Sequence, residues 1–342
     1  MRRSIDAASE TSSLSRGQPD AAAVRPTPMP LSTDARLFCA FAKRSVNPTR
    51  TGCRRPMRLW IDARVLRVRR AAPGTRRGRG ASDPMHLSID ARLSYEFADP
   101  SDLLLQVEVA RMSGQEVRED SLSTTPVEGF RRIAGEAALG KRAWMRASGR
   151  LDLTYLAQVE VTRPDPVWKD LSADAPRTMT AEATGYLLPS RYCPSGDFQA
   201  FVGAEFGDLT GGPLVAAMRD WIEGQFSYIP GTSTAATTAR DTFVQRQGVC
   251  RDYAHVMITF CRAAGLPARM ASVYAPDVDP PDFHAVTEVW LGDAWHLVDA
   301  TGMSTASHIA VIGVGRDAAD VSFMTSYGSA QMLTQAVDVR AI

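Results

Sequence analysis

The chain has 342 residues, of which 44% are hydrophobic. This length is enough for about two domains with apolar cores of their own. The formal net charge of +1 conceals a division, because residues 1–84 hold 18 Lys and Arg against 6 Asp and Glu, whereas the remainder holds 21 against 32. With this negative balance, the remainder is not expected to bind nucleic acid.

Cysteine spacing and hydropathy indicate the compartment. The cysteines are odd in number and show no disulfide or zinc spacing; they are Cys39, Cys53, Cys193, Cys250 and Cys261. No apolar run approaches the roughly 20 residues needed to span a bilayer, and the N-terminus lacks the apolar segment of a secretory signal. The sequence therefore predicts a cytoplasmic protein without membrane association, and it implies no metal and no cofactor.

The basic N-terminal segment, residues 1–84, is rich in Arg, Ala, Pro and Ser and shows little sustained periodicity, so we expect it to be disordered. Three interpretations stay open for it. It is an Arg-rich targeting peptide, a tail that binds nucleic acid or an anionic surface, or an upstream extension of a gene whose translation begins at Met85. The third is favoured, because a strand-like pattern begins directly at Met85.

Strand patterns dominate the region that follows. Four segments alternate apolar and polar residues: Leu87–Phe97, Leu103–Ala110, Ala143–Arg146 and Leu151–Val161. With Gly, Asp and Pro between them, residues 85–163 are expected to form an antiparallel β-sandwich that frames a cleft or binds a partner. Residues 164–200 contain several prolines and are interpreted as a linker. A second domain is expected over residues 201–342.

The second domain contains helix patterns and ends in strand patterns. Pro213–Glu223 is typical of an amphipathic helix, and Thr237–Gln245 of another. Near the C-terminus, Ile309–Val314 and Ala336–Val339 are strand-like, and we expect them to complete the sheet of this domain. The sequence Ser-Arg-Tyr-Cys at 190–193 indicates no chemical role, so packing is expected there.

Cys250 opens a predicted helix. The run Cys250–Ala264 has apolar residues at helical spacing, and Gly265 and Pro267 provide its stop. Unpaired N–H groups and the helix dipole at a helix N-terminus favour an anion, so the pKa of a thiol placed there is lowered. Cys250 is therefore a candidate nucleophile, although a free cysteine is more commonly a small buried hydrophobe.

A hairpin pattern lies downstream of this helix. The apolar runs His284–Leu291 and Ala294–Ala300 are separated only by a Gly-Asp dipeptide, which is typical of a two-residue β-turn. Counting outward from the turn pairs Val286 with Asp299. It places His284 and Asp299 on one sheet face as diagonal neighbours, roughly 7–8 Å apart at the backbone. Asp299 then accepts a hydrogen bond from one imidazole nitrogen and leaves the other for a thiol, unless the register slips by one residue.

The chain order Cys250, His284, Asp299 suits a thiol nucleophile, a general base and the residue that orients the base. Taken singly, His284 is more commonly a core or surface histidine, and Asp299 a turn or cap carboxylate. Together they predict an enzyme that attacks an amide through a thioester. Release by water gives a peptidase or amidase, and release by an amine gives an acyltransferase. The alternative is a non-catalytic, peptide-binding scaffold of the same fold.

Five blocks of sequence resemble the bacterial transglutaminase-like superfamily. They are Phe226-Ser-Tyr-Ile-Pro-Gly-Thr, Gly248-Val-Cys-Arg-Asp-Tyr-Ala-His, Cys261-Arg-Ala-Ala-Gly-Leu-Pro-Ala-Arg, Asp282-Phe-His-Ala and Trp295-His-Leu-Val-Asp-Ala-Thr-Gly. They occur in the family's order over roughly residues 220–302. One departure is visible: many family members have His-Ala-Trp at the histidine, whereas Val286 follows here. This weakens any inference about substrate stacking.

The resemblance implies a papain-like α+β fold, in which the nucleophile helix packs against an antiparallel sheet that bears the histidine and the aspartate. It implies Cys250 as the nucleophile, His284 as general base and acid, and Asp299 as the residue that orients the imidazole. The preceding β-rich region resembles a domain often attached to such cores. The expected partner is a peptide or protein amide, with hydrolysis favoured over amine transfer, and the oligomeric state stays open.

Three further residues near Cys250 have other interpretations. His255 is five positions after Cys250, about 140° round the helix, so we expect it to point away from the sulfur and to pack in the core or at the surface. Asp252 lies in the first turn, where a carboxylate caps the helix. Tyr228 is a candidate for a second oxyanion donor.

Overall fold

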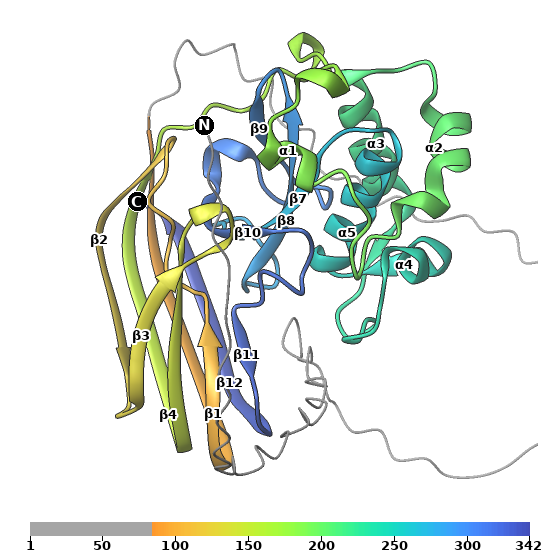
Figure 1. The fold of residues 1–342 in the computed structure, drawn as a ribbon. Helices are drawn as coiled ribbons and strands as arrows, with labels where there is room; N and C mark the ends of the chain where they lie inside the picture. The colour runs from red at the N-terminus through yellow and green to blue at the C-terminus, as the bar shows by residue number, and fades with distance from the viewer. Residues whose placement is uncertain (1–83) are drawn as a thin grey trace, which may run out of the picture. The chain divides into compact units, whose positions relative to one another are not determined.

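The computed structural model describes residues 84–342, which form a mixed α and β fold with two main sheets and a group of helices (Figure 1). The interpretations of the basic N-terminal segment lie outside the described residues. Within the described part of the chain, no helix is both long and apolar enough to cross a membrane.

Two strands of 21 residues form the centre of the first sheet. β1 (Met85–Leu105) and β4 (Lys141–Val161) pair antiparallel along nearly their whole length. β2 (Gln115–Thr124) and β3 (Glu128–Ala134) pair with successive parts of β4. Alternate residues of β1 and β4 are buried, so one face of this sheet is apolar and the other meets solvent.

The apolar face of the first sheet is covered by the C-terminal half of the chain. Its side chains, among them Ile89, Tyr95 and Tyr155, form one core with Tyr274 and Phe323. The β-sandwich expected for residues 85–163 is therefore not confirmed, since among residues 84–342 these strands belong to a single six-stranded sheet. The second layer that an apolar sheet face needs is supplied by another part of the fold.

The last two strands also belong to the first sheet. β11 (Met324–Ser326) and β12 (Ala330–Ala341) both pair antiparallel with β1. The expectation that Ala336–Val339 completes the other sheet is therefore wrong. β12 pairs with β1 because their buried faces match: Val337 lies opposite Ala91 of β1, and both are buried.

The second sheet is four-stranded and antiparallel, in the order β10-β7-β8-β9. Its strands are β7 (Ala268–Tyr274), β8 (His284–Leu291), β9 (Ala294–Val298) and β10 (Ala310–Gly315). The expected hairpin is confirmed, because Leu291 pairs with Ala294 and Trp290 with Trp295. Both residues of the Gly-Asp turn have positive φ, 58° and 63°, as a two-residue hairpin of this kind requires.

Helices cover one side of the second sheet (Figure 1). They are α2 (Gln199–Phe206), α3 (Gly211–Gln225), α4 (Ala239–Gln245) and α5 (Cys250–Ala263). Three of these were expected from the sequence, and α2 was not. The central one, α5, packs on β8, where the Thr287 hydroxyl donates to the backbone oxygen of Ala254 at 3.3 Å. Its Phe260 ring lies at the centre of a cluster of aromatic rings.

Short elements connect these parts. They are the 3-10 helices η1 (Glu136–Ala138), η2 (Trp168–Asp170), η3 (Pro176–Thr178), η4 (Ser195–Phe198) and η5 (Ala306–His308), the helix α1 (Ala181–Gly185), and the strands β5 (Ser227–Tyr228) and β6 (Gln247–Gly248). Four of them lie in the stretch interpreted as a linker, which therefore contains local helical structure.

Replacing Phe260 by Ala is expected to lower the free energy of unfolding by about 3–5 kcal/mol, because it opens a cavity in the aromatic cluster. Urea unfolding measures the change. The matched control is Val244→Ala on α4, whose residue is 75% exposed and should change stability by no more than about 0.5 kcal/mol. Equal effects of the two substitutions would contradict this packing.

Candidate active site

Cys250 is the first residue of α5. Just before it, the backbone at Gly248 passes close to the first turn of the helix. β6 pairs in parallel with β5, which sets Gly248 opposite Tyr228. A Cβ at Gly248 would lie 2.7 Å from the Cβ of Asp252, so this position requires glycine. Cys250 is 1% exposed. Its thiol therefore lies at the positive end of a helix and out of bulk water, where the helix dipole favours a thiolate.

Asp252 caps this helix, as expected from the sequence. Its Oδ2 accepts the N–H of Val249 at 2.9 Å, and its Oδ1 lies 3.5 Å from the Arg251 guanidinium. Burial raises the pKa of Asp252, against the charge of Arg251 and the hydrogen bond from Val249. Arg251 also donates to the hydroxyl of Ser233 and the backbone oxygen of Thr234, at 3.0 and 2.9 Å. The start of α5 is thereby tied to a neighbouring loop.

His284 and Asp299 meet in the interior. His284 Nε2 and Asp299 Oδ2 are 2.8 Å apart, and the two side chains are 0% and 1% exposed. The expected contact is present, but the expected strand pair of Val286 with Asp299 is not. β9 ends at Val298, so Asp299 is the first residue past the strand.

After the strand ends, the chain turns around the Asp299 carboxylate. Its Oδ1 accepts the N–H and the hydroxyl of Thr301 at 2.9 and 2.7 Å, and its Oδ2 accepts the N–H of Ser304 at 3.0 Å. With His284, four donors therefore fix this carboxylate. Sequence reasoning missed Thr301 and Ser304. The signal that was present is the Asp-x-Thr pattern, since such side chains bond the backbone two residues on.

The electrostatics of His284 connect it to Cys250. Burial lowers the pKa of the imidazole, but the charge and hydrogen bond of Asp299, together with the hydrogen bond and charge of Cys250, raise it to about 10. Burial raises the pKa of Asp299, but His284 and Thr301 hold it below its usual value. Nδ1 of His284 has no other hydrogen-bond partner among the described residues. The structure therefore brings the three sequence-predicted residues together, with the imidazole between carboxylate and thiol.

His255 packs in the core on another side of α5, as expected. Its ring stacks on Tyr192 with centroids 4.9 Å apart, and its Nε2 accepts the N–H of Ala318 at 3.2 Å. Burial, with the charges of Arg251 and Arg262, lowers its pKa well below the usual value. His255 is thus a neutral core residue that takes no part in the Cys250 site.

The sequence at 190–193 packs against the same side of α5. The Ser190 hydroxyl accepts a hydrogen bond from Arg262 at 2.9 Å, and the Cys193 thiol donates to the backbone oxygen of His255 at 3.6 Å. Both partners belong to α5. The packing role expected for this motif is therefore confirmed: it braces the helix that begins at Cys250.

Tyr228 lies beside the first turn of α5. Its ring centroid is 6.0 Å from that of Tyr253, which is one helical turn after Cys250. Its role as an oxyanion donor stays a prediction. Among residues 84–342, no group of three or more His, Cys, Asp or Glu side chains is arranged to hold a metal ion.

Comparisons with known proteins identify the family of this fold. A family model of the transglutaminase-like superfamily matches residues 206–300. The crystal structure of a candidate cysteine protease from Cytophaga hutchinsonii superposes with a TM-score of 0.72 at 30% identity, covering 76% of this chain and 92% of that one. The chain belongs to the transglutaminase-like superfamily. Its core is therefore a transglutaminase-like core, as the sequence blocks indicated.

Curated relatives of this superfamily member come from mycobacteria. An uncharacterized protein of Mycobacterium leprae is 30% identical over 145 residues, which are 40% of this chain and 52% of the relative. An uncharacterized protein of Mycobacterium tuberculosis is 33% identical over 127 residues, or 32% and 40% of the two chains. The chain thus spans about half the length of these relatives, or less.

The His284–Asp299 pair should make stability depend on pH. With a pKa raised to about 10, His284 contributes stability that is complete below its unfolded pKa of about 6.5 and is lost as the pH rises through about 10. Asp299→Asn is expected to lower the free energy of unfolding by about 3–5 kcal/mol at pH 7. This difference between variant and wild type should narrow between pH 7 and pH 10. Urea unfolding at several pH values measures it.

The control for this titration is His308→Gln, because His308 pairs with an aspartate, Asp277, that is 56% exposed. A surface pair of this kind contributes at most about 1 kcal/mol, so its pH profile should follow that of the wild type. A gap for Asp299→Asn that stays constant from pH 7 to pH 10 would contradict the buried ion pair.

Proposed function

We propose that the protein is a cysteine-dependent enzyme that cleaves a peptide or other amide bond through a thioester on Cys250. The observation that carries this proposal is the buried imidazole of His284, held at 2.8 Å by Asp299 and coupled to a thiol at the start of a helix. A thiol, a base and a residue that orients the base are the parts that covalent acyl transfer needs.

The first half of the reaction forms the thioester. Cys250 and His284 form a thiolate–imidazolium pair, with the proton of the thiol held on Nδ1 of His284, and the sulfur attacks the carbonyl carbon of the amide. The oxyanion that forms is stabilised by N–H groups of the first turn of α5. The imidazolium then protonates the amide nitrogen, the C–N bond breaks, and the amine leaves while the acyl group stays on sulfur.

The second half releases the acyl group. Water gives a proton to His284 as its oxygen attacks the thioester carbon, and the C–S bond breaks to yield a carboxylic acid. The positive charge of protonated His284 then balances the negative charge of the released Cys250 thiolate, and the starting pair is restored. Asp299 holds the imidazole in one orientation and stabilises its charged form throughout. An amine in place of water would make the same steps a transfer.

Hydrolysis of a peptide or protein amide is the favoured outcome. The likeness to a candidate cysteine protease, at 30% identity over 92% of that protein, supports it. A non-catalytic scaffold would have no use for a buried imidazole–carboxylate pair beside a thiol, because burying such groups is costly. The cytoplasmic location and the nature of the partner stay predictions.

Alkylation with iodoacetamide at pH 6–7, mapped by mass spectrometry, tests the proposal. We expect fast labelling of Cys250, because a thiolate is the reactive form, and His284→Ala should slow it. Turnover of peptide substrates should vanish in Cys250→Ala and fall by about 100-fold or more in His284→Ala. Cys193 and Cys261 are internal controls, since burial raises the pKa of each to about 12.

His308→Ala is the matched control for His284→Ala, because His308 is partly exposed and its ring contacts the exposed Asp277. It should label at the wild-type rate. Slow labelling spread over several cysteines, unchanged by His284→Ala, would contradict the proposed chemistry and favour the peptide-binding scaffold.

A further inference from the structure

The two residues before His284 form the entry into β8, because the strand begins at His284 itself. Phe283 is 1% exposed and stacks on Phe323, with centroids 4.6 Å apart and planes at 10°. It also packs on Tyr274 at 5.5 Å. The entry into the strand is therefore held on one side by aromatic packing.

Asp282 holds this entry on the other side. Its Oδ1 accepts the N–H of Phe283 at 2.7 Å and also a hydrogen bond from the side-chain amide of Gln335. Gln335 lies on β12, the last strand of the chain, opposite Leu93 of β1. A residue two positions before His284 is thereby bonded to the C-terminal strand of the chain.

Gln335 is a polar residue on an apolar face. Its partner Leu93 is buried, and so is Val337, the next residue of β12 on that face. An amide in such a place is costly unless it makes a hydrogen bond. Among residues 84–342 its nitrogen donates to Asp282, whereas its oxygen has no hydrogen-bond partner. The bond to Asp282 therefore gives the physical reason for an amide here.

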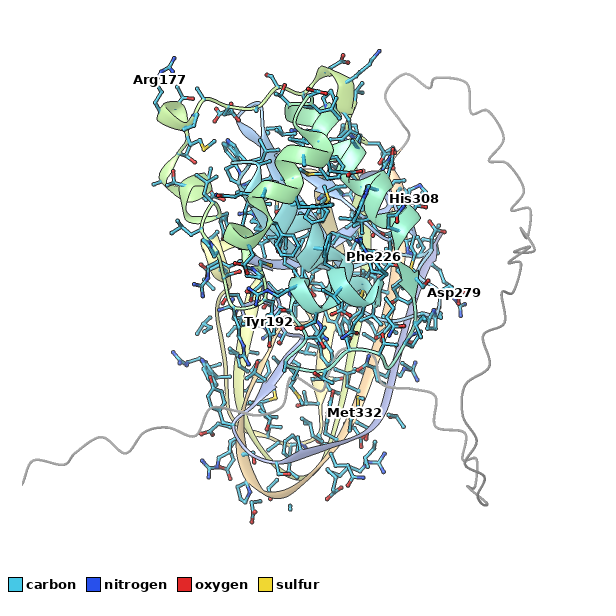
Figure 2. The ribbon with its side chains drawn as sticks, turned by 90° about the vertical axis from the view of Figure 1, so that its right-hand side faces the viewer. Arg177, Tyr192, Phe226, Asp279, His308 and Met332 are labelled. Atoms are coloured by element: carbon cyan, nitrogen blue, oxygen red, sulfur yellow. The ribbon has the colours of Figure 1, made fainter. Side chains whose placement is uncertain are left out.

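This bond is partly buried. Burial, followed by the charge of Asp282, raises the pKa of Tyr95 on the same sheet face. The Tyr95 hydroxyl donates to the sulfur of Met332 at 3.7 Å, and Figure 2 shows Met332 on the long-stranded sheet, below Tyr192 and Phe226. A carboxylate–amide bond that is partly screened from water in this way is stronger than the same bond in bulk water.

We propose that Asp282 and Gln335 form a clamp through which the C-terminal strand positions His284 for its reaction with Cys250. Both are positioning residues, since neither touches the reacting atoms. The inference rests on the proposed function for its consequence in catalysis. A displacement of about 1 Å in a reacting group costs on the order of 100-fold in rate. Loss of the clamp should therefore lower the reactivity of the Cys250 thiol.

The test exchanges the roles of the two partners. Gln335→Glu sets a second carboxylate against Asp282 and breaks the bond at pH 8. The double variant Asp282→Asn with Gln335→Glu offers the reversed hydrogen bond, from the amide nitrogen at 282 to the carboxylate at 335, and the amide oxygen at 282 remains as an acceptor for the Phe283 N–H after a small adjustment of the side chain. Gln331→Glu is the matched control, because Gln331 is exposed on the same strand opposite Glu96.

Two readouts separate this inference from the proposed function. The first is the pKa of His284 in the full chain, followed by NMR with carbon-13-labelled histidine and assigned with His284→Gln. The second is the rate of alkylation of Cys250. The thermal midpoint of each variant shows that it is folded.

We expect Gln335→Glu to shift the His284 signal, to lower its pKa by about one unit or more, and to slow alkylation about tenfold or more. The double variant should recover both values, and Gln331→Glu should match the wild type. Unchanged His284 titration in Gln335→Glu, or a folded double variant without recovery, would overturn the clamp. If wild-type Cys250 proves unreactive, the proposed function fails, while the NMR titration still decides on the clamp.

Discussion

The burial of α5 along almost its whole length is the constraint on which the rest of the fold depends. Every residue from Cys250 to Arg262 is buried, so the helix cannot shift without disturbing the layers on both of its sides. Such burial requires partners for its polar side chains. Arg262, for example, donates to the backbone oxygens of Leu188, Ala268 and Arg316. Segments distant in sequence thus converge on one helix and hold the sulfur at its first residue still.

The other half of the site is held by hydrogen bonds more than by apolar packing. Asp299 receives four donors, one of them the imidazole of His284. In a site of low dielectric, such bonds are stronger than in water and also more costly to leave unmade. The two halves meet where α5 packs on β8, the strand that begins with His284. The distance between thiol and imidazole is therefore set by the packing of a helix on a sheet.

The sequence predicted the elements whose signals are local. The helix at Cys250 followed from its periodicity and its glycine stop, and the hairpin after His284 from a two-residue turn. β2 and β3 were missed because most of their side chains are exposed, so apolar alternation is weak. β12 was recognised as a strand but assigned to the wrong sheet, since alternation reveals a buried face and not its partner. The turn around Asp299 was missed because the apolar run Ala294–Ala300 was interpreted as strand throughout, although the Asp-x-Thr pattern signals a turn there.

The first sheet is part of the folding unit rather than an attachment to it. The chain begins this sheet with β1 and returns to it with β11 and β12, so the second sheet lies between them in sequence. Residues 206–300, which the family model matches, leave out β10, the partner of β7. They also leave out the apolar face that covers Tyr274. In a chain limited to residues 206–300, the sheet that bears His284 would lose one edge strand and expose part of its core to water. The resulting loss of folding free energy scales with the apolar area uncovered.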